Sequence, residues 1–256
     1  MSKKVIFHVY RQKEKNGKNY YDTFEIPVQQ GMTVLEGLFY IQDHLDSSLA
    51  FRYSCRGAIC GSCGMTINKF PQLACKTQIL PIEHKKRKRV PKLTFSKNEP
   101  KWNPKKELLI EPLPNMEVIK DLIVDMETFW AFYKKIQPYF SREITDQPPE
   151  SKQSPEQAQK IEHLVYCILC GLCWTCPVSG KKPQYYGPAA LAKGFRFIDD
   201  SRLSEKQRKN ILDNAMNENG VPLCERIFAC NEVCPKNVRP GTAIQKIRKK
   251  VREQNE

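Results

Sequence analysis

Residues 54–75 have the sequence SCRGAICGSCGMTINKFPQLAC, which holds four cysteines at a distinctive spacing. We call them the first cysteine group: Cys55, Cys60, Cys63 and Cys75. Four residues separate the first two cysteines and two residues separate the next two, which is the spacing of plant-type [2Fe–2S] proteins. A structural zinc site is the alternative, but zinc sites favour paired two-residue steps. The spacing therefore predicts a [2Fe–2S] cluster.

The residues between these cysteines are small. A [2Fe–2S] cluster bound by four thiolates is a net anion, so the surrounding loop has to turn backbone N–H groups toward it. Gly57, Gly61 and Gly64, together with Ala58 and Ser62, allow the backbone to approach closely. The composition of the loop thus agrees with the cluster predicted from the spacing.

The chain before this loop predicts a sheet and a helix. Residues 4–10 and 19–28 alternate between apolar and polar side chains, as strands do. Apolar residues within 34–45 recur at helical spacing, and Thr33 with Glu36 forms a capping box in front of them. Strand, strand, helix and cysteine loop is the order expected of a β-grasp domain.

The remaining cysteines lie in two further groups. The second group is in CILCGLCWTCP, residues 167–177, and the third is in residues 221–236. In bacterial ferredoxin runs, the last cysteine precedes a proline and binds the other cluster of a pair. By that rule Cys176 leaves the second group, and Cys234, which also precedes a proline, joins it. The predicted [4Fe–4S] ligands are then Cys167, Cys170, Cys173 and Cys234.

Three cysteines are left for the last cluster: Cys176, Cys224 and Cys230. Ile227 occupies the position where a regular two-residue step would place a fourth cysteine. A cubane corner without a thiolate readily loses its iron, so these three ligands predict a [3Fe–4S] cluster. The three predicted sets together use all eleven cysteines.

The rest of the chain is expected to be mainly helical. The apolar spacing predicts helices over residues 115–137, 204–219 and 242–253, and residues 141–157 have the composition of a polar linker. We therefore expect an α+β protein with two domains. Residues 1–106 would form a β-grasp plant-type ferredoxin domain, and residues 107–256 an all-helical, bacterial-ferredoxin-like domain with two clusters.

The grouping of the cysteines disfavours a disulfide scaffold, because the count is odd and the spacings are those of metal ligands. The longest apolar runs are too short to span a bilayer, and the first 15 residues lack the hydrophobic stretch of a secretory signal. We expect thiolates in a reducing compartment, and expect another subunit to provide any membrane contact.

The net charge is +14, and part of it is concentrated in HKKRKRVPK, residues 84–92. This run is either a solvated loop or a contact for a partner or an anionic lipid surface. No nucleic-acid-binding motif accompanies the charge, so nucleic acid is not expected as a partner. No flavin-binding glycine motif or carboxylate-binding set of Arg and His is present, and no catalytic residue is predicted.

At this point the chain resembles the iron–sulfur subunit of the succinate dehydrogenase and fumarate reductase family. The motifs that carry the resemblance are GMTVLEGL, FRYSCRGAICGSCGMTIN, ACKTQI, EPLPNMEVIKDLIVD, CILCGLC, GPAALAKGFRFIDDSR and CNEVCPKNVRPGTAIQKIRKK. The resemblance implies electron transfer from FAD in a partner flavoprotein, through the [2Fe–2S], [4Fe–4S] and [3Fe–4S] clusters, to a quinone in a membrane-anchor subunit. Some members also hold heme in that anchor. It also implies a peripheral position on the cytoplasmic face of the cell membrane. The alternative is an iron–sulfur subunit of a soluble fumarate reductase with a thiol or protein donor.

The chain differs from the family pattern in several places. Two residues separate Cys173 from Cys176, where the family has three, and residues 81–106 are longer and more basic. Some ubiquinone-linked members have a Trp soon after the proline that corresponds to Pro177, and a His where Glu225 stands here. The sequence is closer to menaquinone-linked fumarate reductases, in which a lysine aligned with Arg248 approaches the quinone. The resemblance therefore implies that Pro177, Ile227 and Arg248 lie near a quinone.

Overall fold

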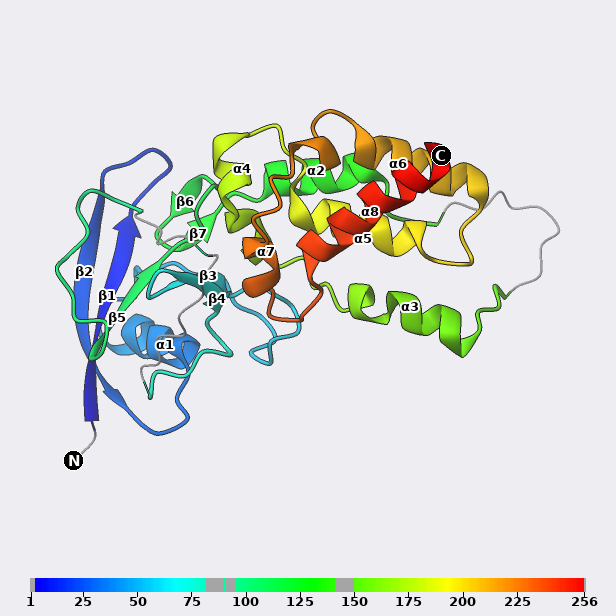
Figure 1. Ribbon diagram of the computed structural model, residues 1–256. Helices are drawn as coiled ribbons and strands as arrows, with labels where there is room; N and C mark the ends of the chain where they lie inside the picture. The colour runs from blue at the N-terminus through cyan, green and yellow to red at the C-terminus, as the bar shows by residue number, and fades with distance from the viewer. Residues whose placement is uncertain (1–2, 82–89, 91–94, 141–149, 256) are drawn as a thin grey trace. The chain divides into compact units, whose positions relative to one another are not determined.

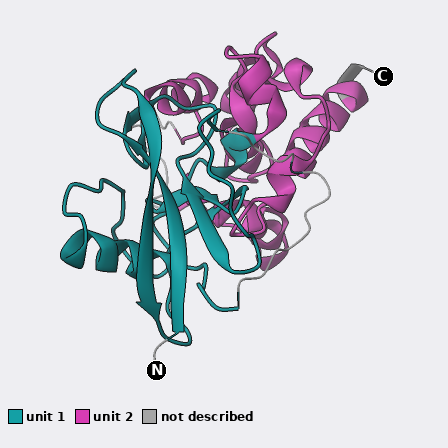
Figure 2. Ribbon diagram, turned by 90° about the vertical axis from the view of Figure 1, so that its left-hand side faces the viewer, with its two compact units in different colours: residues 1–126, 170–175 teal, residues 127–169, 176–256 magenta. Residues whose placement is uncertain are grey.

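The structure is a computed structural model that describes residues 3–81, 90, 95–140 and 150–255. The chain forms two compact units, coloured separately in Figure 2. Unit 1 comprises residues 1–126 and 170–175, and unit 2 comprises residues 127–169 and 176–256. The domain boundary expected between residues 106 and 107 separates the predicted [2Fe–2S] ligands from the predicted ligands of the other two clusters. The two units of the structure are instead defined by which residues pack together.

Unit 1 is built on a five-stranded sheet with the strand order β2-β1-β5-β3-β4 (Figure 1). The strands are β1 (Lys3–Gln12), β2 (Asn19–Val28), β3 (Gly64–Ile67), β4 (Phe70–Leu73) and β5 (Glu107–Glu111). β1 pairs antiparallel with β2 and parallel with β5. The predicted strands over 4–10 and 19–28 are confirmed as β1 and β2.

Helix α1 (Val34–His44) confirms the predicted helix and its capping box. The Thr33 hydroxyl accepts from the Glu36 N–H at 3.2 Å, and the Glu36 carboxylate accepts from the Thr33 N–H at 2.7 Å. A Cβ on Gly37 would lie 2.8 Å from the Phe7 ring and 3.0 Å from Ile26. Glycine therefore lets α1 pack directly on β1 and β2.

The expected helix over 115–137 is wrong in its first half. The structure has a hairpin of β6 (Val118–Lys120) and β7 (Ile123–Val124), followed by α2 (Glu127–Ile136). Asp121 lies in the turn with φ +46° and is buried. Its carboxylate accepts from the backbone N–H groups of Gln12 and Ala50 and from the Arg11 guanidinium. These long-range hydrogen bonds hold a turn where the apolar spacing alone favours a helix.

The apolar side chains of α2 are unequally buried. Phe129 and Ile136 are buried, whereas Trp130 is 39 % exposed. Ile136 packs against α5 at Gly194, where a Cβ would lie only 2.7 Å from the Ile136 side chain. The core of this region is therefore set by the i and i+7 positions of the shorter helix.

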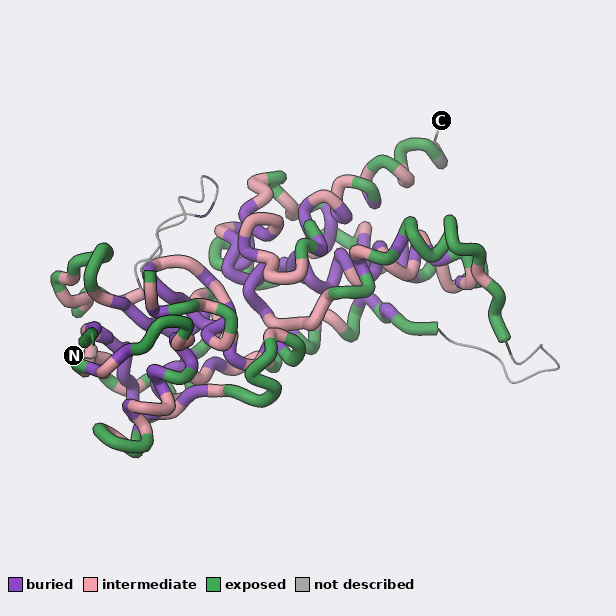
Figure 3. The backbone as a smooth tube through the Cα atoms, turned by 90° about the horizontal axis from the view of Figure 1, so that it is seen from below, coloured by how far each residue is buried: buried purple, intermediate pink, exposed green. Residues whose placement is uncertain are grey.

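Unit 2 is helical, and its helices pack around α5 (Figure 1). Figure 3 shows which stretches of the backbone are buried and which are exposed. Besides α2, its helices are α3 (Pro155–Val165), α4 (Pro177–Lys181), α5 (Gly187–Ile198), α6 (Glu205–Met216), α7 (Ala229–Glu232) and α8 (Pro240–Asn255). A 3₁₀ turn, η2 (Val221–Leu223), lies before the third cysteine group. α5 contacts α2, α3, α6 and α8, and most of its residues are buried.

The predicted helices over 204–219 and 242–253 are confirmed as α6 and α8. Ser204 caps α6 by accepting from the Gln207 N–H at 3.3 Å. Of the predicted linker, residues 141–149 lie outside the described residues, and α3 begins at Pro155. In the basic run 84–92, only Val90 is described.

Candidate iron–sulfur centres

The first cysteine group lies in a loop of unit 1 whose backbone N–H groups point at sulfur atoms. Cys55 Sγ accepts from the N–H groups of Gly57, Ile59 and Cys60 at 3.4, 3.3 and 3.2 Å. Cys60 Sγ accepts from the Cys55 N–H at 3.5 Å. Hydrogen bonds of this kind stabilise a sulfur that carries negative charge. The loop is therefore suited to an anionic centre with thiolate ligands.

Two thiols of this group have opposite acidities. Burial acts to raise the pKa of Cys60, but hydrogen bonds from the Ser62 hydroxyl and from the Cys55 and Ser62 N–H groups lower it to about 6. Burial raises the pKa of Cys63 to about 12, although the Cys75 N–H donates to its sulfur at 3.5 Å. The surroundings thus favour the thiolate form of Cys60 and disfavour that of Cys63.

Left-handed backbone residues accompany all three cysteine groups, in pairs two residues apart. Their φ values lie between +52° and +76°, and the pairs are Arg56 and Ala58, Leu169 and Gly171, Arg226 and Phe228, and Asn237 and Arg239. Alternation of left- and right-handed residues turns successive N–H groups to one side and forms a concavity that binds anions, as in many iron–sulfur sites. Since most of these residues are not glycine, the strain is about 1–3 kcal/mol each, and the surrounding structure must hold it.

The sequence predicts that glycines let the backbone of this loop approach the cluster closely. In the structure, only some of these glycines have a conformation or a neighbour that requires glycine. Gly61 has φ +76°, but no positive φ occurs at Gly57, where the flanking Arg56 and Ala58 have it instead. A Cβ on Gly64 would lie 3.2 Å from the Cys170 carbonyl oxygen, so this position needs glycine for space. No periodicity in the sequence marks Arg56 or Ala58 as left-handed.

The three cysteines assigned to the [3Fe–4S] cluster all belong to unit 2 and lie close together. Cys176 and Cys230 are buried, and burial raises the pKa of both thiols. Negative charge on Cys224 raises both values further, and charge on Cys176 raises that of Cys230. The three thiols therefore interact electrostatically in a buried environment, which suits a shared cationic metal centre.

The four cysteines assigned to the [4Fe–4S] cluster are divided between the units. Cys167 and Cys234 belong to unit 2, and Cys170 and Cys173 belong to unit 1. Burial raises the pKa of Cys167, and charge on Cys234 raises it further. The Val238 N–H donates to Cys234 Sγ at 3.3 Å. The structure thus brings Cys167 and Cys234 together, and the complete four-ligand set stays a prediction.

Arg248 has a role in unit 2 that the sequence did not reveal. Its Nη2 donates to the carbonyl oxygens of Val221 and Cys224 at 2.7 and 2.8 Å. The guanidinium of α8 therefore braces the segment that carries Cys224. The position of Arg248 in the sequence could have indicated this role. Arg248 follows the buried Ile244 by four residues, so the two residues lie on the same face of the helix. The other two quinone-proximal candidates, Pro177 and Ile227, are half-buried.

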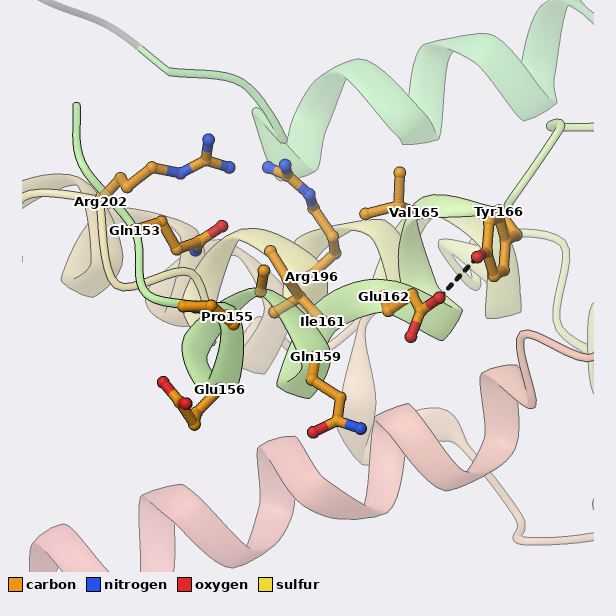
Figure 4. A pocket seen from close by; sticks show the side chains of 11 residues that line it. Gln153, Pro155, Glu156, Gln159, Ile161, Glu162, Val165, Tyr166, Arg196 and Arg202 are labelled. Carbon is orange, nitrogen blue, oxygen red and sulfur yellow. Dashed lines mark hydrogen bonds between the residues drawn. The ribbon is translucent and has the colours of Figure 1, made fainter. Parts of the chain in front are cut away.

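An open groove of about 690 Å³ lies elsewhere in unit 2, beside α3 (Figure 4). Arg196 and Arg202 reach into it and share the carboxylate of Asp200, which is fully buried. Arg202 binds this carboxylate through Nε at 2.9 Å and Nη2 at 2.7 Å, and Arg196 pairs with it at 3.3 Å. Asp200 therefore balances two cations on this side of α5.

Two features are absent from the residues that the structure describes. None of the helices in residues 3–81, 95–140 and 150–255 is both long and apolar enough to cross a bilayer. Over the same residues, no three His, Cys, Asp or Glu side chains are arranged to hold a single metal ion.

The sulfur-directed N–H groups, the left-handed pairs and the clustered thiols define an iron–sulfur protein. Two family models agree: a 2Fe-2S iron-sulfur cluster binding domain matches residues 6–131, and a 4Fe-4S dicluster domain matches residues 163–238. The chain belongs to the family of fumarate reductase and succinate dehydrogenase iron–sulfur subunits.

Three curated relatives illustrate the similarity. The fumarate reductase iron–sulfur subunit of Mycobacterium tuberculosis is 35 % identical, with 96 % of this chain and 92 % of the relative covered. The subunit of the same name from Haemophilus influenzae is 35 % identical, with 87 % and 82 % covered. The succinate dehydrogenase iron–sulfur subunit of Coxiella burnetii is 36 % identical, with 95 % and 94 % covered.

Among solved structures, a chain of the Mycobacterium smegmatis Sdh1 complex in the apo form is similar in fold. Its TM-score is 0.82 at 21 % identity, and the similarity covers 99 % of this chain and 98 % of that chain.

Proposed function

We propose that this chain is the electron-transfer subunit of a succinate:quinone oxidoreductase or quinol:fumarate reductase. It would connect the FAD of a partner flavoprotein with a quinone in a membrane-anchor subunit. One observation carries the proposal. In all three cysteine groups, left-handed backbone pairs lie next to cysteines that either accept hydrogen bonds from backbone N–H groups or lie close to other cysteines. The comparisons do not favour the soluble alternative with a thiol or protein donor.

The proposed ligand sets follow the sequence prediction. The [2Fe–2S] ligands are Cys55, Cys60, Cys63 and Cys75, and the [4Fe–4S] ligands are Cys167, Cys170, Cys173 and Cys234. The [3Fe–4S] ligands are Cys176, Cys224 and Cys230. We also propose that the N-terminal sheet with α1 is a β-grasp domain and that the helical part is bacterial-ferredoxin-like. When bound, the clusters supply sites that accept and release one electron at a time.

The protein residues control the environment of these sites. N–H groups such as those of Ile59 and Cys60 stabilise negative charge on the ligand sulfur. Burial of Cys176 and Cys230 keeps water from their thiols, and a low local dielectric strengthens each remaining hydrogen bond. Arg248 holds the backbone at Cys224 in place. These residues bind and orient, and none of them transfers a proton to a dicarboxylate.

The proposed partners are an FAD-containing flavoprotein and one or more membrane-anchor subunits that bind quinone and, in some relatives of this kind, heme. Pro177, Ile227 and Arg248 would lie near the quinone, at the [3Fe–4S] end. Lys246, Lys249 and Arg252 of α8 are exposed, which suits anionic headgroups. The subunit would then be peripheral, on the cytoplasmic face of the cell membrane, held there by its partners.

The experiment is redox-titrated EPR of the intact complex, together with iron and acid-labile sulfide analysis. We expect a three-iron signal in the oxidised complex and a [2Fe–2S] signal on reduction. Zinc in place of iron, or two cubane clusters without a three-iron centre, would overturn the assignment. Quinone-linked turnover that is absent while dye-linked turnover is intact would overturn the quinone linkage alone.

A further inference from the structure

Ser179 places a hydroxyl against one of the proposed [3Fe–4S] ligands. It lies on α4, which begins directly after Cys176. Ser179 Oγ is 3.3 Å from Cys176 Sγ, and both residues are buried, with 5 % and 6 % of their surface exposed. At hydrogen-bond distances to sulfur, this is a direct contact between a hydroxyl and a ligand atom.

The direction of this hydrogen bond is determined by metal binding. In the free thiol either atom can be the donor. A cysteine bound to iron is a thiolate without a proton, so only the Ser179 hydroxyl can donate. The bond withdraws negative charge from the sulfur, and it becomes stronger when an added electron makes the centre more negative. Such a bond therefore favours the reduced form of the centre, which raises its reduction potential.

Packing alone does not require a hydroxyl at this position. The adjacent Val178 is buried and apolar, and Cys176 belongs to the same apolar core as Leu191 and Ile244. A hydroxyl buried in such surroundings is unfavourable unless it is hydrogen-bonded. In the part of the chain that the structure describes, Cys176 Sγ is the hydrogen-bond partner of the Ser179 hydroxyl. The buried hydroxyl is therefore satisfied by its contact with the sulfur.

A second buried hydroxyl lies near the same set of ligands. Tyr185 is 1 % exposed, and burial raises the pKa of its phenol, as does charge on Cys224. Its ring lies in the same core as Cys176, and Cys176 and Cys230 are near enough to interact with it electrostatically. Tyr185 therefore lies near the same thiols, and the contact that carries the argument is that of the Ser179 hydroxyl with Cys176 Sγ.

We propose that Ser179 raises the reduction potential of the centre held by Cys176, Cys224 and Cys230. The proposal rests on the proposed function, because it requires a three-iron centre at these thiols. Ser179 acts on that centre only through the Cys176 sulfur, and is therefore a positioning residue. Its consequence is a higher electron affinity at the end of the chain of clusters proposed to face the quinone.

The test uses the intact complex with its flavoprotein and anchor subunits. Ser179→Ala removes the hydroxyl, and Ser179→Thr keeps it. The midpoint potential of the three-iron EPR signal is measured in each, and the [2Fe–2S] signal of the same sample is the internal control. We expect Ser179→Ala to shift the three-iron midpoint to a more negative value, Ser179→Thr to restore it, and the [2Fe–2S] midpoint to stay unchanged.

A spectroscopic measurement separates this role from a purely structural one. Pulsed EPR of the three-iron signal after exchange into D₂O should detect an exchangeable hydrogen in the wild type that is absent in Ser179→Ala. An unchanged midpoint in Ser179→Ala, or an unchanged hydrogen coupling, would overturn the proposal. If the three-iron signal is lost in Ser179→Ala but present in the wild type, the hydroxyl is needed to keep the cluster bound. That result would also overturn the proposal that it sets the reduction potential. Absence of the signal in the wild type would instead refute the proposed function.

Discussion

Arg248 offers the sharpest test of how unit 2 holds its three-cysteine centre. Substitution Arg248→Gln removes a charged donor whose Nη2 binds the carbonyl oxygens of Val221 and Cys224. A hydrogen bond from a charged group contributes about 1.5–3 kcal/mol. Because Arg248 is half-buried and water can replace part of each bond, we take about 2 kcal/mol for the pair. That free energy corresponds to an about 30-fold increase in opening of the Cys224 segment.

The assay is the rate at which the three-iron EPR signal of the intact complex disappears in the presence of an iron chelator. We expect a loss about 30-fold faster in Arg248→Gln. Arg252→Gln is the matched control, because Arg252 is exposed on the same helix. Equal rates in the two variants would refute the bracing role. An unchanged rate with strongly reduced quinone turnover would show that Arg248 acts at the quinone and not on the backbone.

Four further predictions concern other parts of the chain. Ile227→Cys should convert the three-iron centre toward [4Fe–4S], seen as loss of its EPR signal at unchanged total sulfide. Gly241→Ala should reduce occupancy of the same centre, because the new Cβ would lie 3.1 Å from Cys230 Sγ and 2.9 Å from the Phe228 ring; iron analysis measures this. Asp200→Asn should destabilise unit 2 by about 2–4 kcal/mol, because two cations lose their shared carboxylate, and should lower the urea midpoint. In cluster-free protein, Cys60 should react with iodoacetamide with a half-maximal rate near pH 6, since its lowered pKa leaves it a thiolate above that pH; a midpoint near pH 9 would contradict this.

Local sequence signals predicted the parts of the fold that local physics determines. β1, β2 and α1 follow from side-chain periodicity and from the Thr33 capping box, and all three are present. The first half of the expected helix over 115–137 was wrong because Asp121 receives hydrogen bonds from Gln12 and Ala50, residues far away in the sequence. A single-sequence pattern contains no information about partners that distant.

The candidate site shows the same division between local and long-range information. The cysteine spacing predicts which thiols group together. In the structure, Cys176, Cys224 and Cys230 lie near enough to interact electrostatically, and their assignment as ligands of one cluster stays a prediction. The hydroxyl of Ser179 and the brace by Arg248 could not be predicted, because each depends on how α4 and α8 are placed against the thiols. Left-handed residues such as Phe228 also escaped prediction, since their conformation comes from the surrounding packing and not from an intrinsic preference.

Residues 170–175 belong to unit 1 although the chain on both sides of them belongs to unit 2. Within unit 1, Leu172 is fully buried, and Trp174 exchanges two hydrogen bonds with Asn115, at 3.1 and 3.2 Å. During synthesis, residues 1–126 emerge from the ribosome before Leu172 does. Until Leu172 follows, the apolar surface that it covers in the folded protein is exposed to solvent. The N-terminal half therefore cannot complete its core during synthesis until about fifty more residues have emerged. A gene fragment that stops at residue 126 should for the same reason yield an aggregation-prone product, however intact its [2Fe–2S] loop.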